Sequence, residues 1–260
     1  MTEKNRDGTD RDSRVAIITG ATSGIGEATA RKFVTAGFRV VGNARHGDGL
    51  RALERELGDA FVGIAGDAGD VPVLDSLFEA ALDRFGRPAD IVVANAGRGL
   101  GGSVTDAELS KFEDIARLNV TGVLALLQKA ARSMVESQKS RFPDQAADIV
   151  VIGSVVGRHI SPFSAVYGAT KFAVHGLAEG LRREVGPKGV RVSLVEPGVV
   201  ISGFQDAAGY DDEQVSHFDE AFGPLLYGDD VANAIYAIVT QPPHVHISNI
   251  MVRPTRQDYP

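Results

Sequence analysis

Residues 14–37 read RVAIITGATSGIGEATARKFVTAG, a short apolar run that ends in glycine and continues as a helical pattern. Gly20, Gly24 and Gly26 fall where a strand would turn into a helix. Such a turn lets the backbone approach a pyrophosphate with no Cβ in the way, and it points unpaired helix amides at the negative charge. The spacing is TGxxxGxG rather than the usual dinucleotide fingerprint GxGxxG. We therefore predict a nucleotide-binding turn, with an ordinary glycine-rich turn as the alternative.

Strand and helix patterns alternate along the rest of the chain. The strand runs are nearly continuous in Val, Ile and Ala, which suits parallel strands covered on both faces. Further strands are expected near 38–44, 60–66, 89–97, 148–154, 190–198 and 245–252, and helices near 25–36, 50–57, 73–85, 106–137, around Tyr167, and near 229–240. Repeated alternation implies right-handed crossovers. The predicted fold is α/β, a doubly wound parallel sheet of about seven strands with helices on both faces.

The composition indicates a soluble enzyme and excludes several other classes. Hydrophobic residues make up 43%, enough for one large core, and a net charge of -7 offers no basic field to nucleic acid or an anionic membrane. There is no cysteine for disulfides, thiolate chemistry or metal ligation, and the apolar runs are too short to span a bilayer. Residues 1–13 predict a disordered tail rather than a signal peptide, so the expected location is the cytoplasm. The polar, proline-broken stretch 136–148 predicts a surface loop.

Tyr167 and Lys171 lie four residues apart in AVYGATKFAVHGLAEGLRREV, so one helical turn would place a phenol beside an ammonium group. A free phenol titrates near pH ~10, and proton exchange at neutral pH requires its ionised form to be stabilised by about 3 to 4 kcal/mol. One positive charge at roughly 5 Å supplies about 3 kcal/mol at an effective dielectric of about 20. The pair is a weak signal by itself, because Tyr and Lys share a helix face by chance in many proteins.

Several motifs occur in an order that resembles the short-chain dehydrogenase/reductase family. They are the glycine-rich turn, ANAG at 94–97, Asn119, Ser154, Tyr167 with Lys171, and PGVVIS at 197–202. The resemblance covers the chain from Arg14 to about Tyr236, and this joint occurrence is far more specific than any single motif. It implies one Rossmann-like domain over residues 14–260, which suits the length of the chain, with a mobile substrate loop at about 203–227.

The resemblance also implies a reaction, hydride transfer between a nicotinamide cofactor and the carbon of a secondary alcohol or carbonyl. Tyr167 would give or take the hydroxyl proton, and Ser154 would donate a hydrogen bond to the carbonyl oxygen. Lys171 would lower the tyrosine pKa and hold the nicotinamide ribose, while Asn119 would anchor a water that links Lys171 to solvent. Taken alone, Ser154 would be a turn former and Asn119 a polar helix residue. No metal is expected, because the histidines and carboxylates show no close ligand set.

The preferred cofactor is predicted from the end of the second strand. NAD-binding proteins of this architecture commonly place an acid there, whereas residues 43–46 read NARH. Arg45 stands where NADP-preferring relatives carry an arginine, which can hold a phosphate through two hydrogen bonds. We therefore expect NADP(H), with NAD(H) as the alternative cofactor and a solvated side chain as the alternative for Arg45. Carried over by position, the other cofactor contacts are Gly20, Thr22, Ser23, Gly24, Ile25, Gly26, Asp67, Ala68, Asn95, Ala96, Gly97, Tyr167, Lys171, Pro197, Gly198, Val200 and Ser202.

The sequence constrains the substrate and the oligomeric state less closely than it constrains the cofactor. YGATK, VEPG and the ending VRPTRQ are similar to a branch that acts on small hydroxy acids and related alcohols, including serine and 3-hydroxy acid dehydrogenases. Arg98, Arg158 and His159 are the candidate ligands for a substrate carboxylate. The alternatives are a general carbonyl or 3-ketoacyl reductase, a nonredox enzyme, or a cofactor-sensing protein on the same fold. The family commonly forms twofold contacts, which implies a homotetramer, with a dimer as the second choice.

Overall fold

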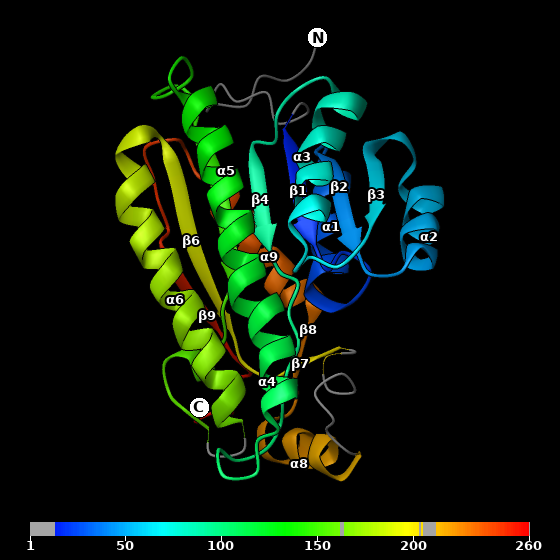
Figure 1. The fold of residues 1–260 in the computed structure, drawn as a ribbon, viewed down its shortest axis with the longest axis vertical. Helices are drawn as coiled ribbons and strands as arrows, with labels where there is room; N and C mark the ends of the chain where they lie inside the picture. The colour runs from blue at the N-terminus through cyan, green and yellow to red at the C-terminus, as the bar shows by residue number, and fades with distance from the viewer. Residues whose placement is uncertain (1–13, 162–163, 203, 205–211, 260) are drawn as a thin grey trace.

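A parallel β-sheet organises the molecule, with helices on both of its faces (Figure 1). The computed structural model describes residues 14–161, 164–202, 204 and 212–259, without the side chains of 212–215. The seven parallel strands follow the order β3-β2-β1-β4-β5-β6-β9. Their bounds are β1 Val15–Thr19, β2 Arg39–Ala44, β3 Phe61–Ala65, β4 Ile91–Ala94, β5 Ala147–Ile152, β6 Val190–Pro197 and β9 Asn249–Val252. The predicted doubly wound α/β fold is confirmed.

Two layers of helices cover the sheet. The layer nearer the viewer in Figure 1 consists of α3 (Val71–Phe85), α5 (Val123–Gln138) and α6 (Ala165–Val185). The other face is covered by α1 (Gly24–Thr35), α2 (Gly47–Leu57) and α9 (Gly228–Val239). Within the described ranges, no helix is long and apolar enough to cross a membrane.

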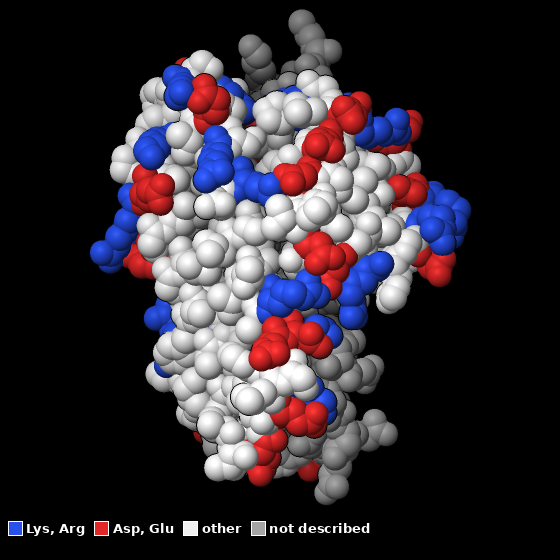
Figure 2. Space-filling model, viewed as in Figure 1, with Lys and Arg blue, Asp and Glu red and all other residues white. Residues whose placement is uncertain are grey.

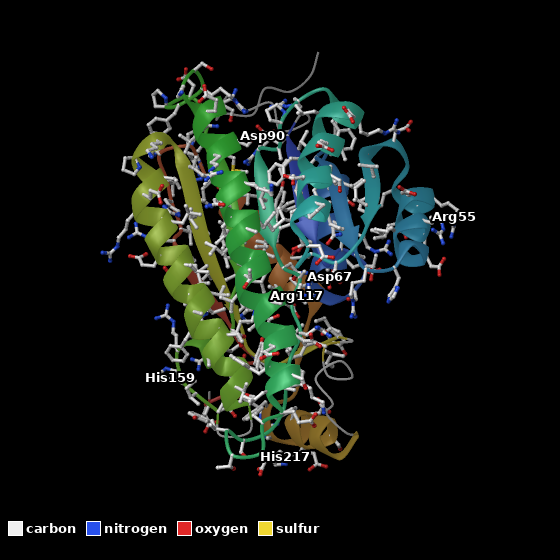
Figure 3. The ribbon with its side chains drawn as sticks, viewed as in Figure 1. Arg55, Asp67, Asp90, Arg117, His159 and His217 are labelled. Carbon is white, nitrogen blue, oxygen red and sulfur yellow. The ribbon has the colours of Figure 1, made fainter. Side chains whose placement is uncertain are left out.

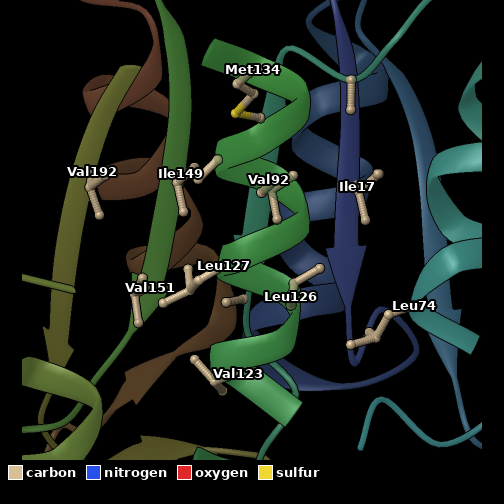
Figure 4. Packing of buried hydrophobic residues seen from close by; sticks show 14 of the residues in the cluster. Ile17, Leu74, Val92, Val123, Leu126, Leu127, Met134, Ile149, Val151 and Val192 are labelled. Atoms are coloured by element: carbon tan, nitrogen blue, oxygen red, sulfur yellow. The ribbon is translucent and has the colours of Figure 1, made fainter. Parts of the chain in front are cut away.

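Each strand contributes to two cores, because successive side chains point to opposite faces of the sheet. Figure 4 shows one core, in which Leu126 and Met134 of α5 pack over Ile17 and Val92. The neighbours of Ile17 and Val92 along their strands belong to the other core, against α1 and α9. Burial on both faces explains why the strands are continuous apolar runs in the sequence.

The carboxyl ends of the strands form the edge at which the order reverses between β1 and β4. In Figure 1 these ends point down, and α4 (Leu109–Ala116), α8 (Asp212–Phe222) and the parallel pair β7 (Val200–Ile201) and β8 (Leu226–Tyr227) lie beyond them. Ligands of open α/β sheets bind outside the carboxyl ends at such a switch point. The fold therefore places the candidate site at this edge.

Some predicted boundaries differ from the structure. The fourth strand ends at Ala94, because the amides of Asn95 and Ala96 donate to the Thr19 side-chain hydroxyl at 3.1 and 3.0 Å instead of to a main-chain carbonyl of a neighbouring strand. The helix predicted at 106–137 consists of α4, a π-helical turn at Arg117–Gly122, and α5. The last strand is restricted to Asn249–Val252, and the predicted substrate loop contains α8 and β8. Its residues 203 and 205–211, like the tail predicted at 1–13, lie outside the described residues.

Two buried aspartates tie together the opposite, amino edge of the sheet. Asp148 pairs with Arg14 at 2.5 Å and with Arg191 at 2.8 Å. Asp90, labelled at this edge in Figure 3, pairs with Arg141 at 2.7 Å. Arg141 belongs to the polar stretch 136–148, so this ion pair attaches the predicted surface loop to the sheet. Removal of either partner would leave a buried charge uncompensated.

Candidate functional site

The glycine-rich turn between β1 and α1 depends on close backbone contact. Gly20 and Gly24 have φ values of +68° and +50°, which L side chains rarely adopt. A Cβ on Gly26 would lie 2.1 Å from the Gly20 carbonyl oxygen, so glycine is required for α1 to approach β1 this closely. Ser23, which precedes α1, forms no side-chain cap. The first amides of α1 are therefore not bonded by the Ser23 hydroxyl and can donate hydrogen bonds to a phosphate, so the turn fits a pyrophosphate.

Other predicted cofactor residues flank this turn. Thr22 lies against Gly49, where an added Cβ would be 3.0 Å from the threonine Cβ, and Ile25 packs against the core behind α1. Ser202 follows β7, and its Cβ lies 2.9 Å from the position of a Cβ on Gly24. The structure thus brings PGVVIS and the glycine-rich turn together, although they lie far apart in the sequence.

Asn95 attaches β4 to the turn. Its Nδ2 donates to the carbonyl oxygens of Thr19 at 2.9 Å and of Gly20 at 3.2 Å. Ala96 follows, and a Cβ on Gly97 would lie 3.3 Å from Asn119 Oδ1, so the segment bridges the two halves of the site. Thr19, whose hydroxyl accepts two amides of this segment, is a site residue that the predicted contacts do not include. Its signal in the sequence is its place as the first residue of the TGxxxGxG motif, directly before Gly20.

Asp67 and Ala68, predicted to contact the adenine, follow β3. Asp67 accepts from Arg117 at 2.6 Å and from the Gly69 amide at 2.8 Å, and Figure 3 shows Asp67 and Arg117 side by side. Burial raises the pKa of Asp67, but these donors outweigh it and hold the pKa below its ordinary value. A Cβ on Gly122 would lie 2.8 Å from the Ala68 carbonyl oxygen, so the π-helical turn packs directly on this segment.

Arg45 lies directly after β2 and is exposed. Its guanidinium forms no ion pair or hydrogen bond with another described residue. It remains free to pair with an anion at this end of the sheet, as the cofactor prediction requires.

Tyr167 and Lys171 lie on one face of α6, and both are buried. Lys171 Nζ lies 5.8 Å from the centre of the Tyr167 ring and donates to the carbonyl oxygen of Ile152, the last residue of β5, at 2.8 Å. Burial lowers the pKa of Lys171 to about 8, because desolvation disfavours the charged form. The structure therefore places a phenol beside an ammonium group that titrates close to neutral pH.

Ser154 follows β5 and begins the short turn Val155–Gly157. Its Oγ accepts from the Val156 amide at 3.4 Å, and its own amide donates to Nε2 of His175 at 3.3 Å. Val155 and Val156 pack with Tyr167, so this turn brings Ser154 to the Tyr167 face of α6. His175 is a second residue that the motif does not identify. The sequence indicates it only through its eight-residue spacing from Tyr167, which places both residues on the same face of the helix.

Asn119 lies buried in the π-helical turn between α4 and α5. Its carboxamide donates to the Arg98 carbonyl oxygen at 2.8 Å and to Thr170 Oγ1 at 3.2 Å, and it accepts from the Arg98 amide at 3.0 Å. Asn119 thereby joins the segment after β4 to α6, one residue before Lys171. A π-helical turn interrupts the regular backbone hydrogen bonding of a helix and is frequent at functional sites.

The segment Pro197 to Ser202 leaves the sheet at the end of β6. The Gly198 amide donates to the Val252 carbonyl oxygen at 2.8 Å, and the Val199 amide donates to Gln257 Oε1 at 3.0 Å. A Cβ on Gly198 would lie 2.1 Å from the same Gln257 oxygen, so the glycine and the C-terminal glutamine fit each other. Val200 is buried and pairs in β7. Gln257 comes from the ending VRPTRQ, which this contact links to the site.

The walls beside Tyr167 are apolar. Leu100 and Phe204 pack against the cluster of Val155, Val156 and Tyr167. Arg158, one of the three candidate carboxylate ligands, pairs instead with buried Glu196, its Nη2 lying 2.7 Å from Oε1. His159 is exposed. No group of three or more His, Cys, Asp or Glu in the described residues could hold a metal ion.

The chain is similar in sequence and fold to known proteins. The profile of the family described as short chain dehydrogenase matches residues 14–213. The serine 3-dehydrogenase of Agrobacterium fabrum is 34% identical over 249 residues, 95% of this chain and 96% of the relative. A closed form of serine dehydrogenase complexed with NADP+ has a TM-score of 0.86 at 28% identity and covers 94% of this chain and 96% of its own. The 3-ketoacyl-(acyl-carrier-protein) reductase from Brucella melitensis, complexed with NADH, has a TM-score of 0.85 at 30% identity, with 94% and 98% covered.

Lys171→Met should remove a pH dependence of stability. The unfolded lysine keeps its proton up to pH 10.5 and the folded one releases it near pH 8, so the unfolded state binds more protons between these values. Wild-type stability therefore rises with pH in this window. Urea unfolding at pH 7 and pH 10 should show the wild type gaining about 2 to 3 kcal/mol relative to the Met variant. A difference that does not change with pH would contradict the lowered pKa.

Proposed function

Because the chain belongs to the short-chain dehydrogenase family, we propose that it interconverts a secondary alcohol and a carbonyl compound with NADP(H), using Asn119, Ser154, Tyr167 and Lys171. The chain is an oxidoreductase of this family. The observation that carries the assignment of residues is the position of Lys171. It is buried beside the Tyr167 ring and bonded to the end of the strand that Ser154 follows.

The chain supplies proton transfer and orientation, while NADP(H), when bound, supplies or accepts the hydride. In the reductive direction Ser154 donates to the carbonyl oxygen and Tyr167 delivers the proton to it. Lys171 provides positive charge beside the phenol, which favours release of that proton. Asn119 holds the Arg98 backbone and Thr170, and so fixes the wall next to Lys171. A water at Asn119 would return the proton from solvent.

NADP(H) is favoured by two independent observations. Arg45 is exposed at the end of β2, where no acid would repel a 2′-phosphate. One similar structure holds NADP+, and its fold matches over nearly the whole chain. The other similar structure holds NADH, which keeps NAD(H) as the alternative cofactor.

A small hydroxy acid is the first substrate class to test, because the relative from Agrobacterium fabrum is a serine 3-dehydrogenase. Two observations favour a second class, uncharged carbonyl compounds or 3-ketoacyl thioesters. The walls beside Tyr167 are apolar, and Arg158 is paired with Glu196. A nonredox enzyme or a cofactor sensor on this fold would give no absorbance change at 340 nm. A panel of alcohols, hydroxy acids and carbonyls, assayed at 340 nm with both cofactors, separates all of these.

Tyr167→Phe should remove the proton donor and leave the fold and cofactor site intact. Turnover is expected to fall by at least about 10²-fold, as for loss of a general acid and base. The NADPH dissociation constant should stay within about twofold, because the variant lacks only one hydroxyl. Steady-state kinetics and fluorescence titration measure the two quantities. Turnover near the wild-type value in a folded Phe variant would reject the mechanism.

Arg45→Ala should weaken NADPH binding by about 1.5 to 3 kcal/mol, as for loss of a charge-assisted hydrogen bond, and leave NADH nearly unaffected. Adding Ala44→Asp should reverse the preference, because the carboxylate repels the phosphate and accepts from the ribose hydroxyls. Arg55→Ala, at an exposed arginine of α2 labelled in Figure 3, is the matched control. The ratio of kcat/KM for the two cofactors is measured at one ionic strength. A ratio indifferent to Arg45 would make it a solvated surface residue.

The assembly we propose is a homotetramer, with a dimer as the second choice. Figure 2 shows a broad area without charged side chains over the lower parts of α5 and α6. Leu124 of α5 and Phe172 of α6 are 47% and 43% exposed, although large apolar side chains are usually buried. Light scattering at micromolar concentrations should give four times the chain mass of 27.5 kDa. Monomer mass alone would reject the assembly.

The cytoplasmic location is a separate proposal, which cell fractionation tests.

A further inference from the structure

Tyr167, Lys171 and His175 follow one another at four-residue intervals along α6 and share one face of the helix. Lys171 is bonded to the carbonyl oxygen of Ile152 at 2.8 Å. His175, one turn further, accepts the Ser154 amide on Nε2 at 3.3 Å. The same helix face therefore holds the main chain on both sides of Gly153, where β5 ends.

The main chain around Ser154 leaves a space that the His175 ring fills. A Cβ on Gly153 would lie 2.4 Å from Nε2 of the ring, and a Cβ on Gly157 would lie 2.4 Å from the same atom. These contacts are shorter than van der Waals separation allows. Glycine on each side of Ser154 thus allows the imidazole to reach the Ser154 amide.

A buried carboxylate lies on the other side of the ring. Because Nε2 accepts the Ser154 amide, the ring proton belongs on Nδ1. Nδ1 lies 3.9 Å from Oε2 of Glu196, a carboxylate only 1% exposed. Arg158 binds Glu196 through two nitrogens, with Nη2 2.7 Å from Oε1 and Nε on Oε2. Arg158, Glu196 and His175 thus follow one another from the surface to the Ser154 amide.

Burial favours the neutral form of His175. Burial lowers its pKa to about 4; Glu196 opposes this shift, while Lys171 and Arg158 add to it. A neutral imidazole keeps a lone pair for the Ser154 amide at neutral pH. An imidazolium would present a second N–H to that amide and break the contact.

We propose that His175 is a positioning residue for the reaction, kept in the Nδ1-protonated form by Glu196 and Arg158, and that it fixes Ser154 relative to Tyr167 and Lys171. This inference rests on the role proposed above for Ser154. His175 touches no reacting atom, so it acts through the placement of the serine. Arg158 thereby belongs to the machinery that orients Ser154, and not to the substrate carboxylate.

A matched pair of variants separates positioning from packing. His175→Leu fills the space but offers no acceptor, whereas His175→Gln places an amide oxygen near the position of Nε2. We expect His175→Leu to lower kcat by about 10- to 100-fold, because small misplacement of a reacting group is costly. The NADPH dissociation constant should stay within about twofold, and His175→Gln should restore kcat to within about fivefold. His244→Leu, at an exposed histidine near the amino edge, should leave kcat unchanged.

The outcomes that overturn the proposal are distinct from those that overturn the proposed function. Ser154→Ala is assayed beside the His175 variants. Full activity in Ser154→Ala rejects the role of the serine, and with it the proposed mechanism. If Ser154→Ala is inactive while His175→Leu keeps wild-type kcat, or if Leu and Gln lower kcat equally, positioning by His175 is rejected.

A spectroscopic measurement keeps the proposal testable even if the Leu variant does not fold. In wild-type protein labelled with ¹⁵N-histidine, the His175 signals, assigned by their loss in His175→Gln, should show a protonated Nδ1 and an unprotonated Nε2 at pH 7. Glu196→Gln should shift the ring toward the other tautomer or toward exchange between the two. A proton on Nε2 in the wild type would overturn the proposal.

Discussion

The site depends on the attachment of α6 to the carboxyl end of β5. The Lys171 ammonium donates to the last carbonyl of the strand, and two residues later the Ser154 amide donates to α6. The Lys171 bond satisfies the carbonyl oxygen of Ile152 where β5 ends. Burial of the ammonium is unfavourable, as its lowered pKa shows. The fold tolerates this energetic cost beside the Tyr167 ring.

The second constraint is steric and lies on the cofactor side. Gly26 permits α1 to touch the Gly20 carbonyl, and Asn95, which directly follows β4, donates to the same carbonyl. One backbone oxygen thus joins β1, α1 and β4 at the switch point of the sheet. Gly24 extends this junction to Ser202, which follows β7. The nucleotide turn and the segment after β6 are therefore positioned by packing of backbone atoms, which leaves little freedom to either.

The sheet and most helices could be predicted because burial on both faces produces long apolar runs and helical spacing. The close approach of Tyr167 and Lys171 could be predicted because their spacing is local. The contact between His175 and Glu196 could not be predicted, because the two residues meet only where β6 and α6 pack together. The sequence does not predict the π-helical turn at Asn119, since this turn leaves the helical periodicity nearly intact. Gln257 lies fifty-nine residues after Gly198, and only the fold shows that the two fit together.

The distribution of cations bears on which substrates the site can hold. The sequence has no Lys or Arg from Val192 to Val252, a stretch that includes the whole predicted substrate loop. Arg158 is bound to Glu196, and Lys171 is bound to Ile152. A substrate carboxylate would then depend on Arg98 after β4, on Arg253 after β9, or on neutral donors. Neutral donors bind a carboxylate more weakly than a guanidinium does. A strong preference for a hydroxy acid over an uncharged alcohol in the substrate panel would therefore favour contact with one of those two arginines, whereas neutral donors alone would give a weaker preference.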